Sequence, residues 1–227
     1  MKILFVGNSF TFYHDMPLLV EQISEQIGIC IKTDQVTYGG YHLKQYLDET
    51  EEAAQILSDK LSREKWDFIV LQEQSNTPCL CREEFQESAV KLSKKIRENG
   101  AVPVFYQTWS YRDHSDMLEL INMGHEEFFL GLKDSYEEAA HNAEGLLVPV
   151  GDAFFAAEKG NPDIDLMEED NYHPSLAGSF LAACMFFLKF TGQEKLPEYV
   201  PEGLNKETAE KLSAYAREAV RQEGSVK

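Results

Sequence analysis

A serine near the start of the chain and an aspartate and histidine near its end have the types and spacing that chemistry requires. Ser9 follows the short apolar run Ile3–Val6 in the sequence GNSF. Asp170 lies three positions before His173, in the sequence DNYHPS. An aspartate at that spacing can reach one ring nitrogen of the histidine, which leaves the other nitrogen to take a proton from a serine. The pattern therefore indicates nucleophilic catalysis with Ser9, His173 and Asp170 as its parts.

The next two apolar runs of the sequence are Ile29–Val36 and Phe68–Leu71. Each is followed by residues that could donate hydrogen bonds to a negatively charged oxygen. Gly40 lies in YGGYH, where glycine lets the main chain approach a ligand and offer an N–H group. The run QEQSN contains the side-chain amides of Gln72, Gln74 and Asn76, which donate hydrogen bonds without a change of charge. The sequence leaves open which of these three amides would complete an oxyanion hole. Trp109 closely follows the fourth apolar run, Val102–Tyr106, and we expect it to line the substrate pocket.

The elements that must position these residues are strands alternating with helices. The expected strands are Ile3–Val6, Ile29–Val36, Phe68–Leu71, Val102–Tyr106 and Leu146–Val150. The expected helices are Leu18–Ile27, Glu51–Leu61, Glu83–Arg97, Met117–Ala140, Ser175–Phe190 and Lys206–Arg221. Continuous apolar strands joined by long connections predict an α/β fold, with a five-stranded parallel sheet between two layers of helices. Ligands of such sheets bind beyond the carboxyl ends of the strands, where the candidate residues lie.

Composition narrows the class of protein. The 227 residues are enough for one sizeable core, and we expect a single domain over residues 1–227. The formal net charge of −18 disfavours nucleic acid and anionic membranes as partners, so a small neutral substrate is the expected partner. No apolar stretch reaches the length of a membrane span. The sequence does not indicate an oligomeric state.

The four cysteines are few for the length of the chain and lack the spacing of a disulfide framework. Cys79 and Cys81 are closer together than the pair of an ordinary CxxC site, and no second Cys/His pair stands at zinc-finger spacing. We therefore expect reduced thiols, a cytoplasmic location, and neither a metal nor another cofactor.

Taken together, the order of these motifs resembles the four sequence blocks of the SGNH (GDSL-like) hydrolase superfamily. GNSF is similar to the first block with its nucleophile Ser9, Gly40 matches the glycine of the second, and Asp170 and His173 match the terminal pair, spacing included. The third block departs from the usual GxND. Counted from Asp67, Asn76 falls where the family's amide would lie, whereas Gln72 resembles the glutamine of QGES-type blocks.

The resemblance implies a flavodoxin-like three-layer α/β/α fold and a serine esterase that forms an acyl-enzyme. Asn8 stands where many members have aspartate, which brings the chain closest to a bacterial branch of uncertain substrate. A short acyl ester of a carbohydrate or another small molecule is the expected substrate, because the sequence contains no long apolar lid. An acetyl group is the acyl group that we expect.

Two hypotheses from other classes compete with the esterase. One is a flavodoxin-like module that binds a small molecule without chemistry at the same strand ends. The loop after the first strand has one glycine and no lysine, unlike loops that cradle phosphate. The other is an interaction domain whose acidic surface contacts a basic partner. Labelling by a serine-directed fluorophosphonate would separate these hypotheses from the esterase.

Overall fold

A five-stranded parallel sheet forms the middle layer of the computed structural model, which describes residues 1–223. Its strands are β1 (Lys2–Gly7), β2 (Lys32–Thr37), β3 (Phe68–Leu71), β4 (Val102–Tyr106) and β5 (Leu146–Val148). They lie in the order β2-β1-β3-β4-β5, and each neighbouring pair is parallel. Residues 224–227, which the single-domain prediction includes, lie outside the described residues.

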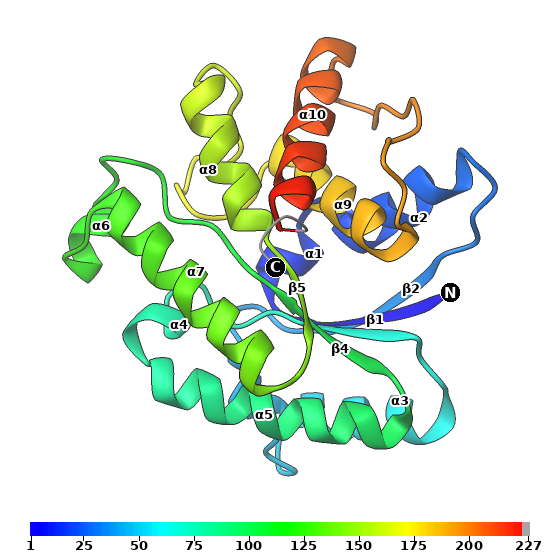
Figure 1. Ribbon diagram of the computed structural model, residues 1–227. Helices are drawn as coiled ribbons and strands as arrows, with labels where there is room; N and C mark the ends of the chain where they lie inside the picture. The colour runs from blue at the N-terminus through cyan, green and yellow to red at the C-terminus, as the bar shows by residue number, and fades with distance from the viewer. Residues whose placement is uncertain (224–227) are drawn as a thin grey trace.

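Each face of the sheet is covered by helices (Figure 1). One face carries α1 (Ser9–Phe12), α2 (Met16–Glu25), α8 (Val150–Gly160), α9 (Leu176–Thr191) and α10 (Lys206–Glu223). The other face carries α3 (Glu52–Arg63), α5 (Arg82–Asn99) and α7 (His125–Asn142). The short elements of the connections are the 3₁₀ turns Tyr13–Asp15 and Leu43–Tyr46 and the helices α4 (Thr77–Leu80) and α6 (Asp116–Ile121). The predicted three-layer α/β/α fold is confirmed.

Alternation of side chains along the central strand explains the two cores. In β1, Ile3 and Phe5 pack against α2 and α9, whereas Leu4 and Val6 join the core beneath α3 and α5. All four side chains are fully buried, so the strand reads as one continuous apolar run.

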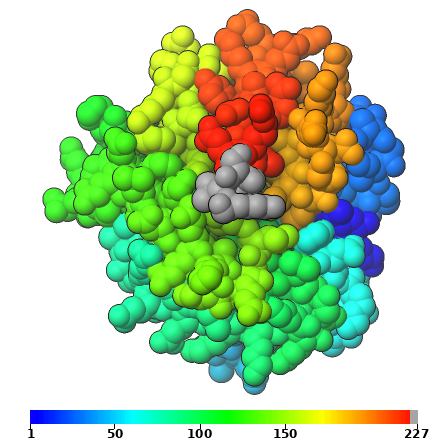
Figure 2. All heavy atoms as spheres, viewed as in Figure 1, coloured from blue at the N-terminus to red at the C-terminus, as the bar shows by residue number. Residues whose placement is uncertain are grey.

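The helix α9 is apolar around its whole circumference because it is enclosed by other helices. It packs against α2, α8 and α10, and the space-filling view shows α10 next to α8 on this face (Figure 2). Ser175 caps its first turn by accepting the N–H of Gly178 at 3.2 Å, as its position before the apolar segment predicts. Within residues 1–223, none of the helices combines the length and the apolar character that crossing a bilayer requires.

Three of the differences between the expected and the observed element boundaries have local reasons. The expected helix Met117–Ala140 is two helices, α6 and α7, because Asn122 adopts a left-handed conformation with φ 52° and ends α6. Val150, predicted to end a strand, begins α8. The second strand begins at Lys32 rather than at Ile29, after a turn at Gly28 with φ 72°.

The topology determines where a ligand can bind. The chain passes from β1 to β2 on one side of β1 and then crosses to β3 on the other side. The strand order therefore reverses next to β1. Loops that follow β1, β2 and β3 therefore diverge around one crevice at the carboxyl end of the sheet. GNSF, YGGYH and QEQSN are these three loops.

Candidate active site

Ser9 is held at the end of β1 by the residue before it. The side chain of Asn8 accepts the backbone N–H of Phe10 at 3.1 Å and so caps α1, in which Ser9 is the first residue. Ser9 is 8 % exposed, with its hydroxyl at the crevice. The first N–H groups of a helix have no partner within the helix, so this turn exposes donors beside the hydroxyl.

A hydrogen-bonded triad joins the two ends of the chain. The Nε2 atom of His173 lies 2.7 Å from Oγ of Ser9, and its Nδ1 atom lies 2.6 Å from Oδ2 of Asp170. The other oxygen of Asp170 accepts the backbone N–H groups of Tyr172 and His173, at 3.2 and 3.0 Å. The structure thus brings together the three residues predicted to do chemistry, in the geometry of a nucleophile, a base and a residue that orients the base.

The environment of Asp170 favours its charged form. Partial burial acts to raise the pKa of this carboxyl, but hydrogen bonds from the His173 side chain and from two backbone N–H groups outweigh it. The net result is a pKa below the ordinary value for aspartate. The carboxylate is therefore available at neutral pH to fix the orientation of the imidazole.

Aromatic rings hold the imidazole of His173 in place. The ring of Tyr13 stacks on it with a centroid distance of 4.2 Å and an interplanar angle of 2°. Tyr172 contacts it at 4.1 Å, and Phe10 lies edge-on at 5.7 Å. Because stacked rings cannot turn independently, the Nε2 atom stays directed at Ser9.

The triad opens into a cavity of about 410 Å³. The cavity is lined by Asn8, Ser9, Phe10, Phe12, Tyr13, Gly39, Gly40, Gln74, Ser75, Tyr172 and His173. Among residues 1–223, no protein group accepts a hydrogen bond from the backbone N–H of Ser9 or of Gly40. Gly40 has φ 73°, a left-handed conformation that favours glycine. These two amides border the cavity as unused donors.

Of the three amides left open by the sequence, Gln74 lines the cavity and the other two do not. Gln72 is fully buried below it, where Oε1 accepts the N–H of Asn8 at 2.9 Å and the hydroxyl of Thr11 at 3.0 Å. Gly7 permits this approach, because a Cβ there would lie 2.6 Å from the same oxygen. Gln72 therefore supports the loop that carries Ser9.

Trp109 lies one layer behind the cavity that we expected it to line. Its ring is 1 % exposed and stacks between Phe10, at 4.7 Å, and Phe154, at 4.1 Å. Its indole N–H donates to the backbone carbonyl of Tyr172 at 3.0 Å. The tryptophan therefore supports both an aromatic wall and the loop before His173.

Sequence reasoning missed Arg112, which holds the loop that carries the Asp/His pair. Its Nε atom donates to Oδ1 of Asn171 at 2.8 Å, and its Nη2 atom donates to Oδ1 of Asp165 at 2.7 Å and to the carbonyl of Met167 at 3.0 Å. Its backbone N–H also donates to the carbonyl of Asn171 at 2.9 Å. A single arginine after a strand carries no motif, so only the fold shows this contact.

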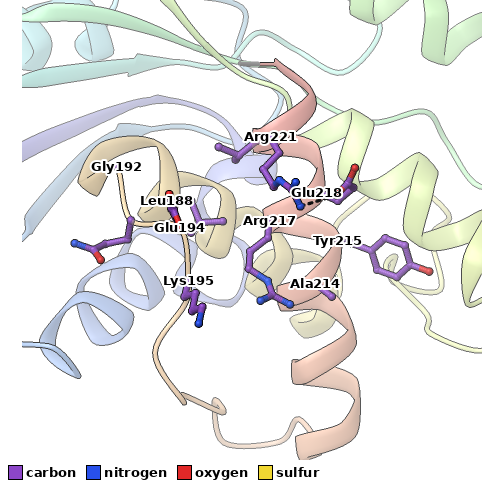
Figure 3. Close-up of a pocket in the computed structure, with 11 residues that line it drawn as sticks. Leu188, Gly192, Glu194, Lys195, Ala214, Tyr215, Arg217, Glu218 and Arg221 are labelled. Atoms are coloured by element: carbon purple, nitrogen blue, oxygen red, sulfur yellow. Dashed lines mark ion pairs between the residues drawn. The ribbon is translucent and has the colours of Figure 1, made fainter. Parts of the chain in front are cut away.

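A larger cavity of about 1010 Å³ lies between the ends of α9 and α10 (Figure 3). Arg217 and Glu218 of α10 and Lys195 of the preceding connection line it. Among residues 1–223, no serine, histidine or cysteine lines it. Nor does the described part of the chain contain a group of three or more His, Cys, Asp or Glu side chains placed to hold a metal ion. The triad cavity is therefore the candidate for catalysis.

Comparison with known proteins identifies solved structures with the same fold. A protein of Slackia heliotrinireducens, itself proposed to be an SGNH hydrolase, is 32% identical, with a TM-score of 0.75 over 84% of this chain and 98% of its own. The structure of an acetyl xylan esterase is 15% identical, with a TM-score of 0.64 over 83% of this chain and 99% of its own. Among curated proteins, none matches the sequence. The fold and its relatives define an SGNH/GDSL-type hydrolase.

The family within this class is also identified. Residues 31–220 match the family described as a domain of unknown function, DUF4886, and the chain belongs to it. A DUF4886 family protein from Bacteroides uniformis superposes with a TM-score of 0.82 at 21% identity, over 100% of this chain and 97% of its own.

Proposed function

We propose that the chain is a serine esterase that cleaves a short acyl ester, such as an acetyl ester, of a carbohydrate or another small molecule. The observation that carries the proposal is the continuous hydrogen-bonded series from Asp170 through His173 to Ser9. A binding module has no need of a base placed 2.7 Å from a hydroxyl. The solved acetyl xylan esterase of the same fold supports an acetyl ester as the first substrate to test.

The first half of the reaction follows from the positions of these groups. His173 takes the proton of Ser9 through Nε2 as Oγ attacks the ester carbonyl, and Asp170 stabilises the imidazolium that forms. The oxyanion is held by the backbone N–H groups of Ser9 and Gly40 and by the side-chain amide of Gln74. His173 then donates its proton to the leaving alcohol, which departs and leaves the acyl group on Ser9.

Water completes the reaction. His173 takes a proton from a water molecule as the water oxygen attacks the acyl carbonyl. The same oxyanion donors hold the second tetrahedral intermediate. Collapse of that intermediate returns the proton to Ser9 and releases the acid.

Aromatic side chains of Phe10, Tyr13 and Tyr172 border a cavity that suits a short acyl group. The four cysteines are free thiols, which supports a reducing compartment such as the cytoplasm.

Labelling with a fluorophosphonate and turnover of p-nitrophenyl acetate test the proposal together. We expect an adduct on Ser9 by peptide mapping, and a fall in kcat of roughly 10⁴- to 10⁶-fold in Ser9→Ala. Ser75 also lines the cavity but contacts the hydroxyl of Tyr111 at 2.7 Å rather than a histidine, so it should remain unlabelled. Folded protein with neither label nor turnover would favour the small-molecule binding module instead.

A further inference from the structure

Glu73 is a buried carboxyl group that the reaction does not use directly. It follows β3, is 1 % exposed and does not line the triad cavity. Burying a carboxylate costs free energy unless hydrogen bonds compensate, so such a residue needs a reason to be there. Its neighbours in space suggest that reason.

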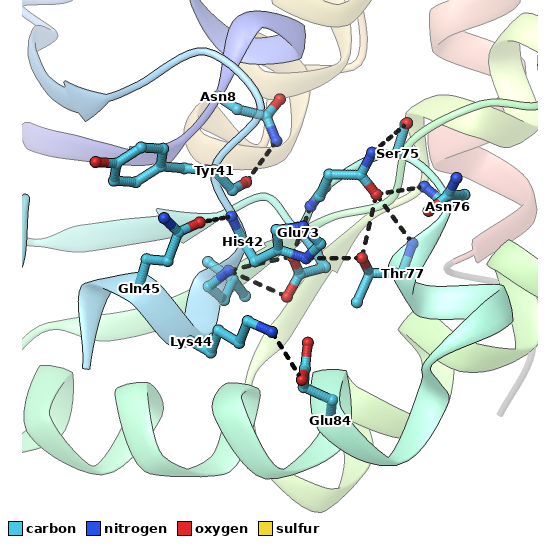
Figure 4. Close-up of polar contacts among 12 residues, drawn as sticks. Asn8, Tyr41, His42, Lys44, Gln45, Glu73, Ser75, Asn76, Thr77 and Glu84 are labelled. Atoms are coloured by element: carbon cyan, nitrogen blue, oxygen red, sulfur yellow. Dashed lines mark hydrogen bonds and ion pairs between the residues drawn. The ribbon is translucent and has the colours of Figure 1, made fainter. Parts of the chain in front are cut away.

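The carboxylate of Glu73 joins two loops of the site. Both of its oxygens accept the backbone N–H of Leu43, at 3.1 and 3.2 Å, and Oε1 also accepts the backbone N–H of Gln74 at 2.7 Å. Leu43 lies three positions after Gly40 in the loop that follows β2. The carboxylate therefore ties the loop that carries one oxyanion donor to the residue that carries another (Figure 4).

We propose that Glu73 is a positioning residue that fixes the Gly40 loop and Gln74 relative to each other, so that their donors meet one oxyanion. This inference rests on the esterase proposed above. Oxyanion stabilisation requires donors placed within a few tenths of an ångström, and it weakens when they can move apart. A bridge between two otherwise separate loops provides that constraint.

A second series of hydrogen bonds orients the amide of Gln74. The hydroxyl of Thr77 donates to Oε1 of Gln74 at 3.1 Å, and Nδ1 of His42 lies 2.9 Å from the same hydroxyl. A hydroxyl has one proton, so while it donates to Gln74 it can accept from His42. Oε1 accepts from Thr77 and from the N–H of Asn76 at 3.0 Å, which assigns the two N–H donors to Nε2. Nε2 donates to Oγ of Ser75 at 3.2 Å, and Ser75 lines the same cavity. One N–H can make this bond while the other is left for the oxyanion.

Charged and titratable groups surround Glu73 on every side. The Nδ1 atom of His42 lies 3.6 Å from its Oε1, and Lys44 of the following turn is paired with Glu84 of α5 at 3.0 Å. From α7, the hydroxyl oxygen of Tyr136 accepts the N–H of Glu73 at 3.2 Å, and Tyr46 is also close enough to interact electrostatically. Burial raises the pKa of Glu73 to about 7, although the N–H groups of Gln74 and Leu43 oppose this rise.

The ionised form binds these N–H groups more strongly than the protonated form. The bridge is therefore tightest above pH 7. Because glutamine resembles the protonated acid in shape and charge, the variant Glu73→Gln should behave like the wild type at low pH only.

The experiment compares kcat and KM for p-nitrophenyl acetate in the full-length wild type, Glu73→Gln and Glu73→Ala from pH 5.5 to 8.5. The ratio of wild-type to Glu73→Gln kcat should rise about tenfold with a midpoint near pH 7, while KM changes less than about threefold. In Glu73→Ala, kcat should fall roughly 10²-fold at every pH. Glu87→Gln, which removes an exposed charge of α5 that pairs with Lys91, should give a flat ratio close to one.

A flat ratio for Glu73→Gln would overturn the inference even if Glu73→Ala is slow, because a general loss of packing lowers kcat at every pH. So would a folded Glu73→Ala enzyme with kcat within about threefold of the wild type. If Glu73→Ala fails to fold, the Glu73→Gln ratio alone decides. Turnover that persists in Ser9→Ala would instead contradict the esterase itself, and that result is recognised before any Glu73 variant is measured.

Discussion

The Nδ2 atom of Asn8 donates a hydrogen bond to the backbone carbonyl of Tyr41 over 2.9 Å. The same side chain accepts the N–H of Phe10 through Oδ1, so a single amide links the nucleophile turn to the loop that carries Gly40. An amide can donate and accept at once, whereas a carboxylate only accepts. This explains why asparagine suits a position where many SGNH hydrolases have aspartate.

Asn8→Asp should therefore impair the enzyme. The aspartate would keep the helix cap but place its second oxygen against the carbonyl of Tyr41, which we expect to lower stability by about 1–2 kcal/mol and kcat by roughly tenfold. Thermal unfolding and turnover of p-nitrophenyl acetate measure these effects. Asn205→Asp is a matched control, because Asn205 caps α10 by accepting the N–H of Thr208. Equal losses in both variants would contradict the explanation.

Gln74→Glu tests which amide completes the oxyanion hole. Glutamate preserves the oxygen that accepts from Asn76 and Thr77 but replaces the donor Nε2 with a second oxygen. We expect kcat to fall at least roughly 10²-fold, because a donor is lost and negative charge is placed near the oxyanion. Asn76→Asp should change kcat much less, since Asn76 does not line the cavity. The reverse order of effects would assign the role to Asn76.

Arg112→Ala should loosen the loop that positions the Asp/His pair. We expect kcat to fall by roughly 10- to 100-fold with little change in KM, because the triad loses alignment rather than contacts with substrate. Arg112→Lys should recover only part of kcat, since an ammonium lacks the planar fork of the guanidinium. Steady-state kinetics at one pH suffice for this comparison.

A matched control for Arg112→Ala is Arg82→Ala. Arg82 pairs with Glu138 and is similarly exposed, with a side-chain exposure of 44% against 38% for Arg112, but it binds α7 rather than the catalytic loop. We expect kcat of Arg82→Ala to equal that of the wild type. A comparable loss in both arginine variants would show that Arg112 contributes only general stability.

The sequence is informative about the triad because strand ends meet at one edge of a parallel sheet, whatever the lengths of the intervening helices. It could not choose between Gln72 and Gln74, because a shift of two residues past the end of β3 separates a buried support from a residue at the cavity. Nor could it place Trp109, since an aromatic ring after a strand can line a pocket or lie behind its wall. These choices depend on packing between distant segments, such as Phe10 and Phe154.

The burial of Glu73 also depends on contacts between distant segments, so the sequence does not predict it. In the sequence it is one acidic residue between two amides, and only the fold shows that it is buried and bound by two loops. A group whose pKa is raised on folding lowers stability as it ionises, so the ionised Glu73 does not stabilise the fold.

Glu73→Gln should therefore stabilise the protein in a pH-dependent way. Because burial raises the pKa of Glu73 from 4.5 to about 7, the folded protein binds more protons than the unfolded chain between these values. The stability contribution of this group is thus fully present below pH 4.5 and is lost as the pH rises through about 7. The variant lacks this loss, so its free energy of unfolding should exceed that of the wild type by up to about 3 kcal/mol more at pH 8 than at pH 5. Urea denaturation at the two pH values measures the difference, and Glu87→Gln, with its exposed side chain, should show no such change. A difference that is the same at both pH values would mean that Glu73 titrates no differently in the folded protein than in the unfolded chain.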